Sequence, residues 1–207
     1  MQFTATVEVT AHLVDRSKPY PPWLRVIKVA YDYENRMARA VVEKGYEEGK
    51  TFIRRYDNKS EFMVRGDPYP ECQRSYLSEA MPPPTLPKSL AFSGVEEVPG
   101  LGSCEHWVDD QGSNRVHVYV PADGRGGEAR WPARLLDEQV LDGESVPLMT
   151  YDLKDLAVGP PEPALSSPRD DPSKGLFGIP APYDWRSCGR NIGGFPYLHI
   201  FHHYLRF

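Results

Sequence analysis

Apolar and polar residues alternate in short runs along the first third of the chain. In the first run Phe3, Ala5 and Val7 alternate with polar residues, a period-two pattern that is typical of a strand with one buried face. The same alternation predicts further strands over Trp23–Tyr33, Arg36–Lys44, Lys50–Tyr56 and Ser60–Val64. Because these runs follow one another at intervals of about ten residues, with short turns between them, they predict a meander of antiparallel strands.

The stretch Phe92–Val120 predicts a hairpin near the middle of the chain. Strands are expected over Glu105–Val108 and Arg115–Val120. The turn between them is rich in Asp, Gly and Asn, which are residues that stabilise tight turns. Trp107 shares one side of this hairpin with Val118, so we expect Trp107 to be buried.

The second half of the chain alternates between strand patterns and proline-rich connections. Two more strands are expected over Glu128–Leu136 and Pro147–Val158, with a helix over Pro132–Val140 as the alternative for the first of them. The stretch Met81–Pro87 is predicted to be a crossover, because proline fixes φ and lacks an amide donor. Gly159–Pro182 is also rich in proline and is predicted to be a surface strap without a core of its own.

The chain ends in an apolar segment. Pro196–Phe207 carries seven large apolar or aromatic residues, and a helix that starts with Pro196 is one interpretation of it. Leaving such a surface in water is unfavourable by roughly 25 cal/mol per Å². We therefore expect the segment to fold back over the sheet as a cover, with Gly193 and Gly194 as the joint.

Taken in order, these elements predict a mainly β fold. The expected architecture is a strongly curved antiparallel sheet, in the form of an incomplete barrel, with few short helices. Residues 1–158 would form the sheet domain. Residues 159–207 would form the proline-rich strap and the aromatic C-terminal segment, packed on the same domain.

Composition and charge narrow the function classes. The chain has 207 residues and a net charge of −5, which does not suggest a nucleic-acid partner, although Arg54 and Arg55 contribute to a weak basic patch. No apolar run approaches the roughly 20 residues that span a bilayer. The N-terminus lacks a signal-peptide pattern, so a cytoplasmic location is favoured. A Cys72–Cys104 pair is one option for the cysteines, but free buried thiols at these positions and at Cys188 are favoured.

The order of several motifs resembles a family of half-barrel proteins. The motifs are FSGVEEV, CEHWVDD, RVHVYVPADG and VPLMTYDLKDLAVGPPEPALSSP, and they follow the run of antiparallel strands. This order is similar to that of the ependymin-related proteins and, more distantly, of the bacterial lipoprotein carriers of the periplasm and their relatives (LolA-like proteins). The resemblance covers roughly Trp23–Pro168. It implies a curved antiparallel sheet around an apolar cavity and, as the expected function, binding of a lipid or another hydrophobic small molecule.

Cys104, His106 and His117 are the candidates for reactive chemistry. Cys104 and His106 point the same way on a strand, and a four-residue loop over 110–113 would place His106 opposite His117. A thiolate with two imidazoles suits a soft metal ion, and a Cys–His pair suits a nucleophile with its base. The alternative is the polar outer face of a hairpin. We favour it because neither a fourth ligand nor an orienting group is evident, so no metal, cofactor or catalytic residue is predicted.

Three functions remain as hypotheses. The first is non-enzymatic binding of an apolar, lipid-like ligand on the concave face of the sheet. The side chains expected to line that face are Ile27, Val29, Tyr31, Trp107, Val118 and Trp131. The second is a protein–protein interaction module whose concave face is plugged by Pro196–Phe207, and the third is a hydrolase that uses Cys104 and His106. Neither a nucleic-acid partner nor a transmembrane segment is expected.

Overall fold

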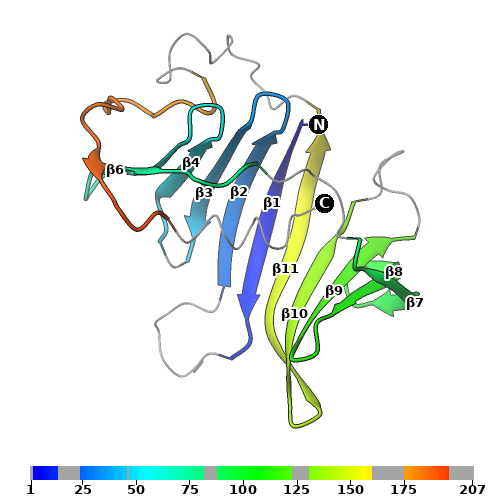
Figure 1. Cartoon of the computed structure of the whole chain (residues 1–207). Coiled ribbons are helices and arrows are strands. Elements are labelled where there is room, and N and C mark those ends of the chain that lie inside the picture. The colour runs from blue at the N-terminus through cyan, green and yellow to red at the C-terminus, as the bar shows by residue number, and fades with distance from the viewer. Residues whose placement is uncertain are drawn as a thin grey trace. The chain divides into compact units, whose positions relative to one another are not determined.

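The computed structural model describes residues 2–13, 24–45, 47–81, 88–122, 131–159 and 175–195. These ranges contain strands and no helix (Figure 1). The twelve strands are β1 (Gln2–Ala11), β2 (Leu24–Asp32), β3 (Met37–Lys44), β4 (Lys50–Arg55), β5 (Ser60–Arg65), β6 (Glu71–Tyr76), β7 (Ala91–Val98), β8 (Gly102–Asp110), β9 (Asn114–Pro121), β10 (Arg134–Leu141), β11 (Glu144–Val158) and β12 (Gly189–Arg190). The prediction of a mainly β fold is therefore confirmed, and in the described ranges no helix is long and apolar enough to cross a membrane.

The strands are hydrogen-bonded in the order β12-β6-β5-β4-β3-β2-β1-β11-β10-β9-β8-β7. The sheet does not close into a barrel, since β12 and β7 stand at the two ends of this order. Neighbouring strands from β2 to β6 and from β7 to β11 pair antiparallel, as predicted. The exception is the short β12, which runs parallel to β6.

The chain divides into two compact units. Unit 1 contains Met1–Thr6, Val26–Thr85 and Asp155–Phe207, and unit 2 contains Val7–Arg25 and Leu86–Lys154. Each unit is described separately below.

The strands predicted before residue 66 are all present, within two residues of the expected bounds. The helical alternative over Pro132–Val140 is wrong, because β10 occupies Arg134–Leu141 and pairs with both β9 and β11. The segment Pro196–Phe207 lies outside the described residues. So does most of the proline-rich crossover, from 82 to 87.

The sheet of unit 1 has two distinct faces, defined by the cross-strand register. The first face carries Ile27, Val29 and Tyr31, which pair with Val42, Ala40 and Ala38. These six side chains are all buried. The second face carries a continuous row of directly paired residues from β2 to β12, namely Ala30, Arg39, Ile53, Phe62, Arg74 and Arg190.

The segment 175–190 packs on the second face of unit 1. Phe177 packs with Ala30 and Met37, while Ile179 and Cys188 join the cluster formed by Ile53, Phe62 and Val64. A disulfide between Cys72 and Cys188 fixes this segment to β6. The prediction of free thiols at these two positions is wrong. The option of a Cys72–Cys104 pair is wrong as well, since Cys188 is the disulfide partner of Cys72 and Cys104 is buried outside any disulfide.

Beyond β12 the chain passes to the first face of unit 1. There the amide of Phe195 donates to Oε1 of Glu61 at 3.1 Å, and the Phe195 ring lies 6.2 Å from that of Phe52. The segment 175–195 therefore wraps the β6 edge of the sheet. The prediction of a strap without a core is wrong for its described part, because Phe177 and Ile179 belong to the core.

Two arginines of β4 are buried and so do not contribute to the predicted weak basic patch. Arg54 has 0% of its surface exposed and forms ion pairs with Glu61, at 3.2 Å, and with Glu79. Arg55 pairs with Asp57 at 2.7 Å. Their charges are neutralised inside the fold and are not presented to a partner.

In unit 2, β8 and β9 form the predicted hairpin. Trp107 pairs with Val118, so the two share a face as expected. Val118 is buried, but Trp107 is only half-buried. The expectation that Trp107 is buried is wrong because its ring packs edge-on against Phe92 of the outermost strand β7, which is itself 54% exposed.

Candidate functional site

The six side chains predicted to line a ligand site divide equally between the two units. Ile27, Val29 and Tyr31 lie on the first face of unit 1. In unit 2, Val118 and Trp131 are buried and Trp107 is half-buried. Only Val29 among the six borders one of the two cavities described below.

Unit 1 contains a cavity of about 430 Å³. Its walls come from β1, β2 and β3, from Asp155 of β11 and from Leu176 of the strap. Apolar side chains such as Ala30, Val41 and Leu176 supply much of the lining, and Arg39 and Lys28 supply positive charge. Thr4, Thr6 and Asp155 add further polar groups to the lining. A volume of this size is typical of a small-molecule site.

Arg39 is the polar group that distinguishes this cavity. Its Nη1 donates to the carbonyl of Leu176 at 2.6 Å, whereas its Nε is buried without a hydrogen-bond partner in the described structure. Burial lowers the pKa of Arg39. By contrast, Lys28 at the rim already pairs with Glu43 at 2.7 Å. The cavity thus combines apolar side chains with the charged groups of Arg39, Lys28 and Asp155, and the Nε of Arg39 has a hydrogen bond left to donate.

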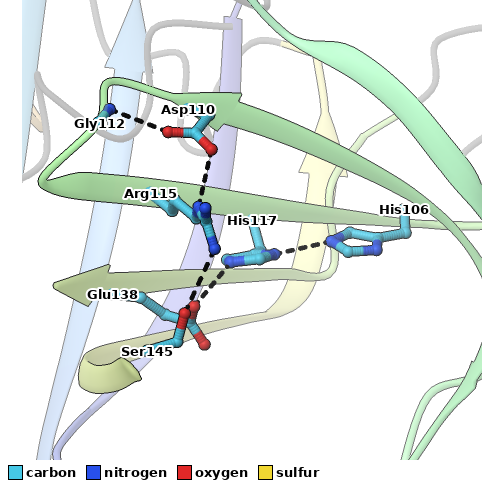
Figure 2. Close-up of polar contacts among 7 residues, drawn as sticks. All are labelled: His106, Asp110, Gly112, Arg115, His117, Glu138 and Ser145. Carbon is cyan, nitrogen blue, oxygen red and sulfur yellow. Dashed lines mark hydrogen bonds and ion pairs between the residues drawn. The ribbon is translucent and has the colours of Figure 1, made fainter. Parts of the chain in front are cut away.

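Unit 2 holds a second polar cluster, built on β8, β9 and β10. Figure 2 shows His106 and His117 pointing toward each other from neighbouring strands, with Nε2 of His106 2.8 Å from Nδ1 of His117. Nε2 of His117 lies 3.0 Å from Oε2 of Glu138, and Nδ1 of His106 lies 3.4 Å from Oε1 of Glu96. Tyr119 stacks on the His106 ring, with centroids 4.7 Å apart. Two carboxylates thus bracket two imidazoles in a line.

The register of this hairpin differs from the predicted one. His106 pairs with Tyr119, and His117 pairs with Val108, so the two histidines are diagonal neighbours and not directly opposite. The turn is shifted because Asp110 belongs to the strand. Its carboxylate accepts from Gly112 N at 2.9 Å and from Nε of Arg115 at 2.8 Å (Figure 2).

The contact between the two rings is a hydrogen bond that needs one N–H and one acceptor nitrogen. Protons on both facing nitrogens would turn two N–H groups toward each other across 2.8 Å.

This cluster predicts a pH-dependent stability. Burial, reinforced by His117 and opposed by Glu96, lowers the pKa of His106. The folded chain therefore binds a proton at His106 less tightly than the unfolded chain does, where histidine has a pKa of about 6.5. The stability that neutral His106 contributes is complete above that pH and is lost as the pH falls through the lowered pKa. His106→Gln should reduce the difference in urea midpoint between about pH 7 and pH 5. Gln111→Asn in the same hairpin is the control, and an unchanged difference in the His106 variant would contradict the assignment.

The environment of Cys104 differs from that of a catalytic nucleophile. Its side chain has no exposed surface, whereas reactive thiols are partly exposed. Both ring nitrogens of His106 face other partners, Glu96 and His117. Across the described residues no group of three or more His, Cys, Asp or Glu side chains is arranged to hold a metal ion.

A smaller cavity of about 350 Å³ adjoins the histidine cluster through Glu96 and Tyr119. Arg134 also lines it, and its guanidinium is bound by Asp152 at 2.5 and 3.1 Å. The sequence pointed to His106 and His117 but missed Glu96 and Glu138. Strand alternation could have placed Glu138 on the same face as His117 only once the β9–β10 register was known.

Comparison with known proteins identifies a fold without a function. No model of a protein family matches the chain, and no match is found among curated proteins. Among solved structures the chain is similar to an uncharacterized conserved protein from Thermus thermophilus. The TM-score is 0.50 at 14% sequence identity, over 77% of this chain and 80% of that one. At this sequence identity the likeness concerns the fold alone.

Proposed function

We propose that the protein is a non-enzymatic binder of a small apolar, lipid-like ligand, held by a strongly curved open sheet of the half-barrel kind. The resemblance to ependymin-related proteins and lipoprotein carriers motivates the ligand class. The cavity of unit 1 supplies a place for it, because its volume of about 430 Å³ falls in the range of small-molecule sites.

The observation that carries the proposal is the buried Nε of Arg39, which has no partner among the described residues. A buried donor without a hydrogen bond is unfavourable by about 1–3 kcal/mol. An acceptor group on a ligand would remove that penalty, and a carboxylate would also meet the positive charge. The ligand is therefore proposed to have an apolar body and one anionic or hydrogen-bond-accepting head next to Arg39.

A second candidate is an interaction module whose sheet is plugged by its own chain. The strap favours it, since Phe177 and Ile179 already fill part of the second face of unit 1. The two candidates differ in the region of Ala30, Val41 and Leu176. There the strap leaves a cavity, which favours the binder.

Native mass spectrometry of the purified protein, followed by titration with a fluorescent fatty acid, tests the binder. Arg39→Met should weaken fatty-acid binding by about 10- to 100-fold, the range for losing a hydrogen bond to a charged group. Lys44→Met is the matched control, because it removes an exposed charge from the same strand. Equal affinity in the Arg39 variant, or no binding by the wild type, would contradict the proposal.

A further inference from the structure

Two arginines flank one tryptophan at the β6 end of unit 1, and a third arginine lies beside one of them. The guanidinium of Arg74 lies over the Trp185 ring at 5.7 Å, and that of Arg186 lies at 5.2 Å from the same ring. Arg190 of β12 is the direct register partner of Arg74 in β6. These two side chains therefore stand next to each other on the second face of the sheet, and Figure 1 shows β12 beside β6.

The positive charges of this group are not neutralised within the described structure. None of the three arginines forms an ion pair with a described acid. Glu71 and Gln73 lie on the opposite face of β6 by strand alternation. Asp184 is near Arg186, but its carboxylate accepts from the Arg186 amide at 2.8 Å. Like charges side by side on neighbouring strands are destabilising, so the group is complementary to an anionic partner.

Exposed apolar side chains accompany the arginines. Tyr76 follows Arg74 on the same face of β6 and is 66% exposed, and Trp185 is exposed as well. Ile192 is 101% exposed. The turn that presents it is anchored, because Asn191 N donates to Arg74 O at 2.8 Å and Asn191 Nδ2 donates to Gln73 Oε1 at 2.9 Å.

When a partner covers an apolar residue that a hydrogen-bonded turn holds in water, the free energy of the system falls. Trp and Tyr are the side chains enriched where lipid meets water, and Arg binds phosphate with two parallel hydrogen bonds. The arginines, Trp185 and Tyr76, with Ile192 at the β12 edge where the chain passes from one face to the other, match a layer of phosphate-bearing headgroups above hydrocarbon. The net charge of the whole chain is −5, so the attraction to anionic headgroups must come from the local positive charge of these arginines.

We propose that this Arg–Trp patch docks the protein onto a lipid surface that carries anionic headgroups. The patch comprises Arg74, Tyr76, Trp185, Arg186, Arg190 and Ile192. The arginines bind lipid phosphates, while Trp185 and Tyr76 lie at the interface and Ile192 enters the hydrocarbon. The docking does not depend on the ligand proposed for the cavity of unit 1.

Co-sedimentation of the full chain with vesicles tests the docking. The protein should bind vesicles of equal parts phosphatidylcholine and phosphatidylserine, and bind phosphatidylcholine alone far less. Each basic residue near an anionic leaflet strengthens partitioning by about fivefold, so the triple variant Arg74→Gln, Arg186→Gln, Arg190→Gln should lose about a hundredfold. A matched triple variant, Lys44→Gln, Lys59→Gln, Lys88→Gln, removes the same charge from exposed positions elsewhere and should bind as the wild type does.

Two single variants report on the patch without disturbing the β6 register. Arg186→Gln and Ile192→Ser alter exposed side chains and should each weaken vesicle binding by several-fold, in line with the loss of one charge or one buried aliphatic group. The proposal is overturned if the wild type does not bind anionic vesicles, or if the lysine variant loses as much as the arginine variant. It is also overturned if free inorganic phosphate displaces the protein completely, since the patch would then be a site for a soluble anion.

Discussion

Replacing Arg54 with methionine is expected to lower the free energy of unfolding by about 3–5 kcal/mol, the range for breaking a buried ion pair from one side. Arg54 is fully buried between Glu61 and Glu79. Tyr56, whose pKa burial raises to about 12, stays neutral and accepts from Nη1 of Arg54 at 3.3 Å. Without the guanidinium, the carboxylate of Glu61 would remain buried beside apolar neighbours. Urea denaturation at neutral pH measures the loss.

A double-variant cycle separates the ion pair from simple packing. Arg54→Met with Glu61→Leu removes both charges and should recover part of the lost stability, because a buried pair replaced by apolar groups is often neutral. Recovery stays incomplete because the Phe195 amide donates to Glu61. Arg36→Met, at an exposed turn, is the control. A loss below about 1 kcal/mol for Arg54→Met would show that the pair is not essential to the fold.

Sequence alternation predicted the strands of unit 1 well because those strands have one polar and one apolar side in the sequence itself. In β1, for example, Phe3, Ala5 and Val7 are buried and the residues between them are half-buried. Strand β6, next to the short terminal strand β12, lacks this contrast, since none of its six residues is fully buried. It was therefore missed, and β10 was placed too early for the same reason, because only Leu135 in it is buried.

The candidate sites depended on information that alternation does not contain. Arg54 and Glu61 are direct register partners, and a sequence without the register offers only a charged residue on each of two strands. His106 and His117 were correctly assigned to one face, because a shift of the strand register by two residues leaves both side chains on the same side of the sheet. Arg39 was not singled out, since the cavity beside it is completed by Leu176, which lies 137 residues further along the chain.

Removing the Cys72–Cys188 disulfide is expected to lower stability by about 2–5 kcal/mol. The bond joins residues 116 apart in sequence, and closing a loop of that length restricts the unfolded chain strongly. The disulfide also fixes the segment 175–195, the described part of the strap and the residues after it, to β6. The parallel pairing of Gly189 with Gln73 should therefore weaken when the disulfide is removed. Cys72→Ser and Cys188→Ser, compared with the wild type by urea denaturation, measure the loss.

Reduction of the wild type supplies the internal control. A dithiol should lower the wild-type midpoint to that of the Cys72→Ser variant and leave the variant unchanged. The double variant should be about as stable as either single one, because both changes remove the same bond. Amide exchange of Asn191 and Phe195, which hydrogen-bond to Arg74 and Glu61, should accelerate when the bond is cut. If the midpoint and these exchange rates do not respond to reductant, the strap is held by its packing on the sheet and not by the disulfide.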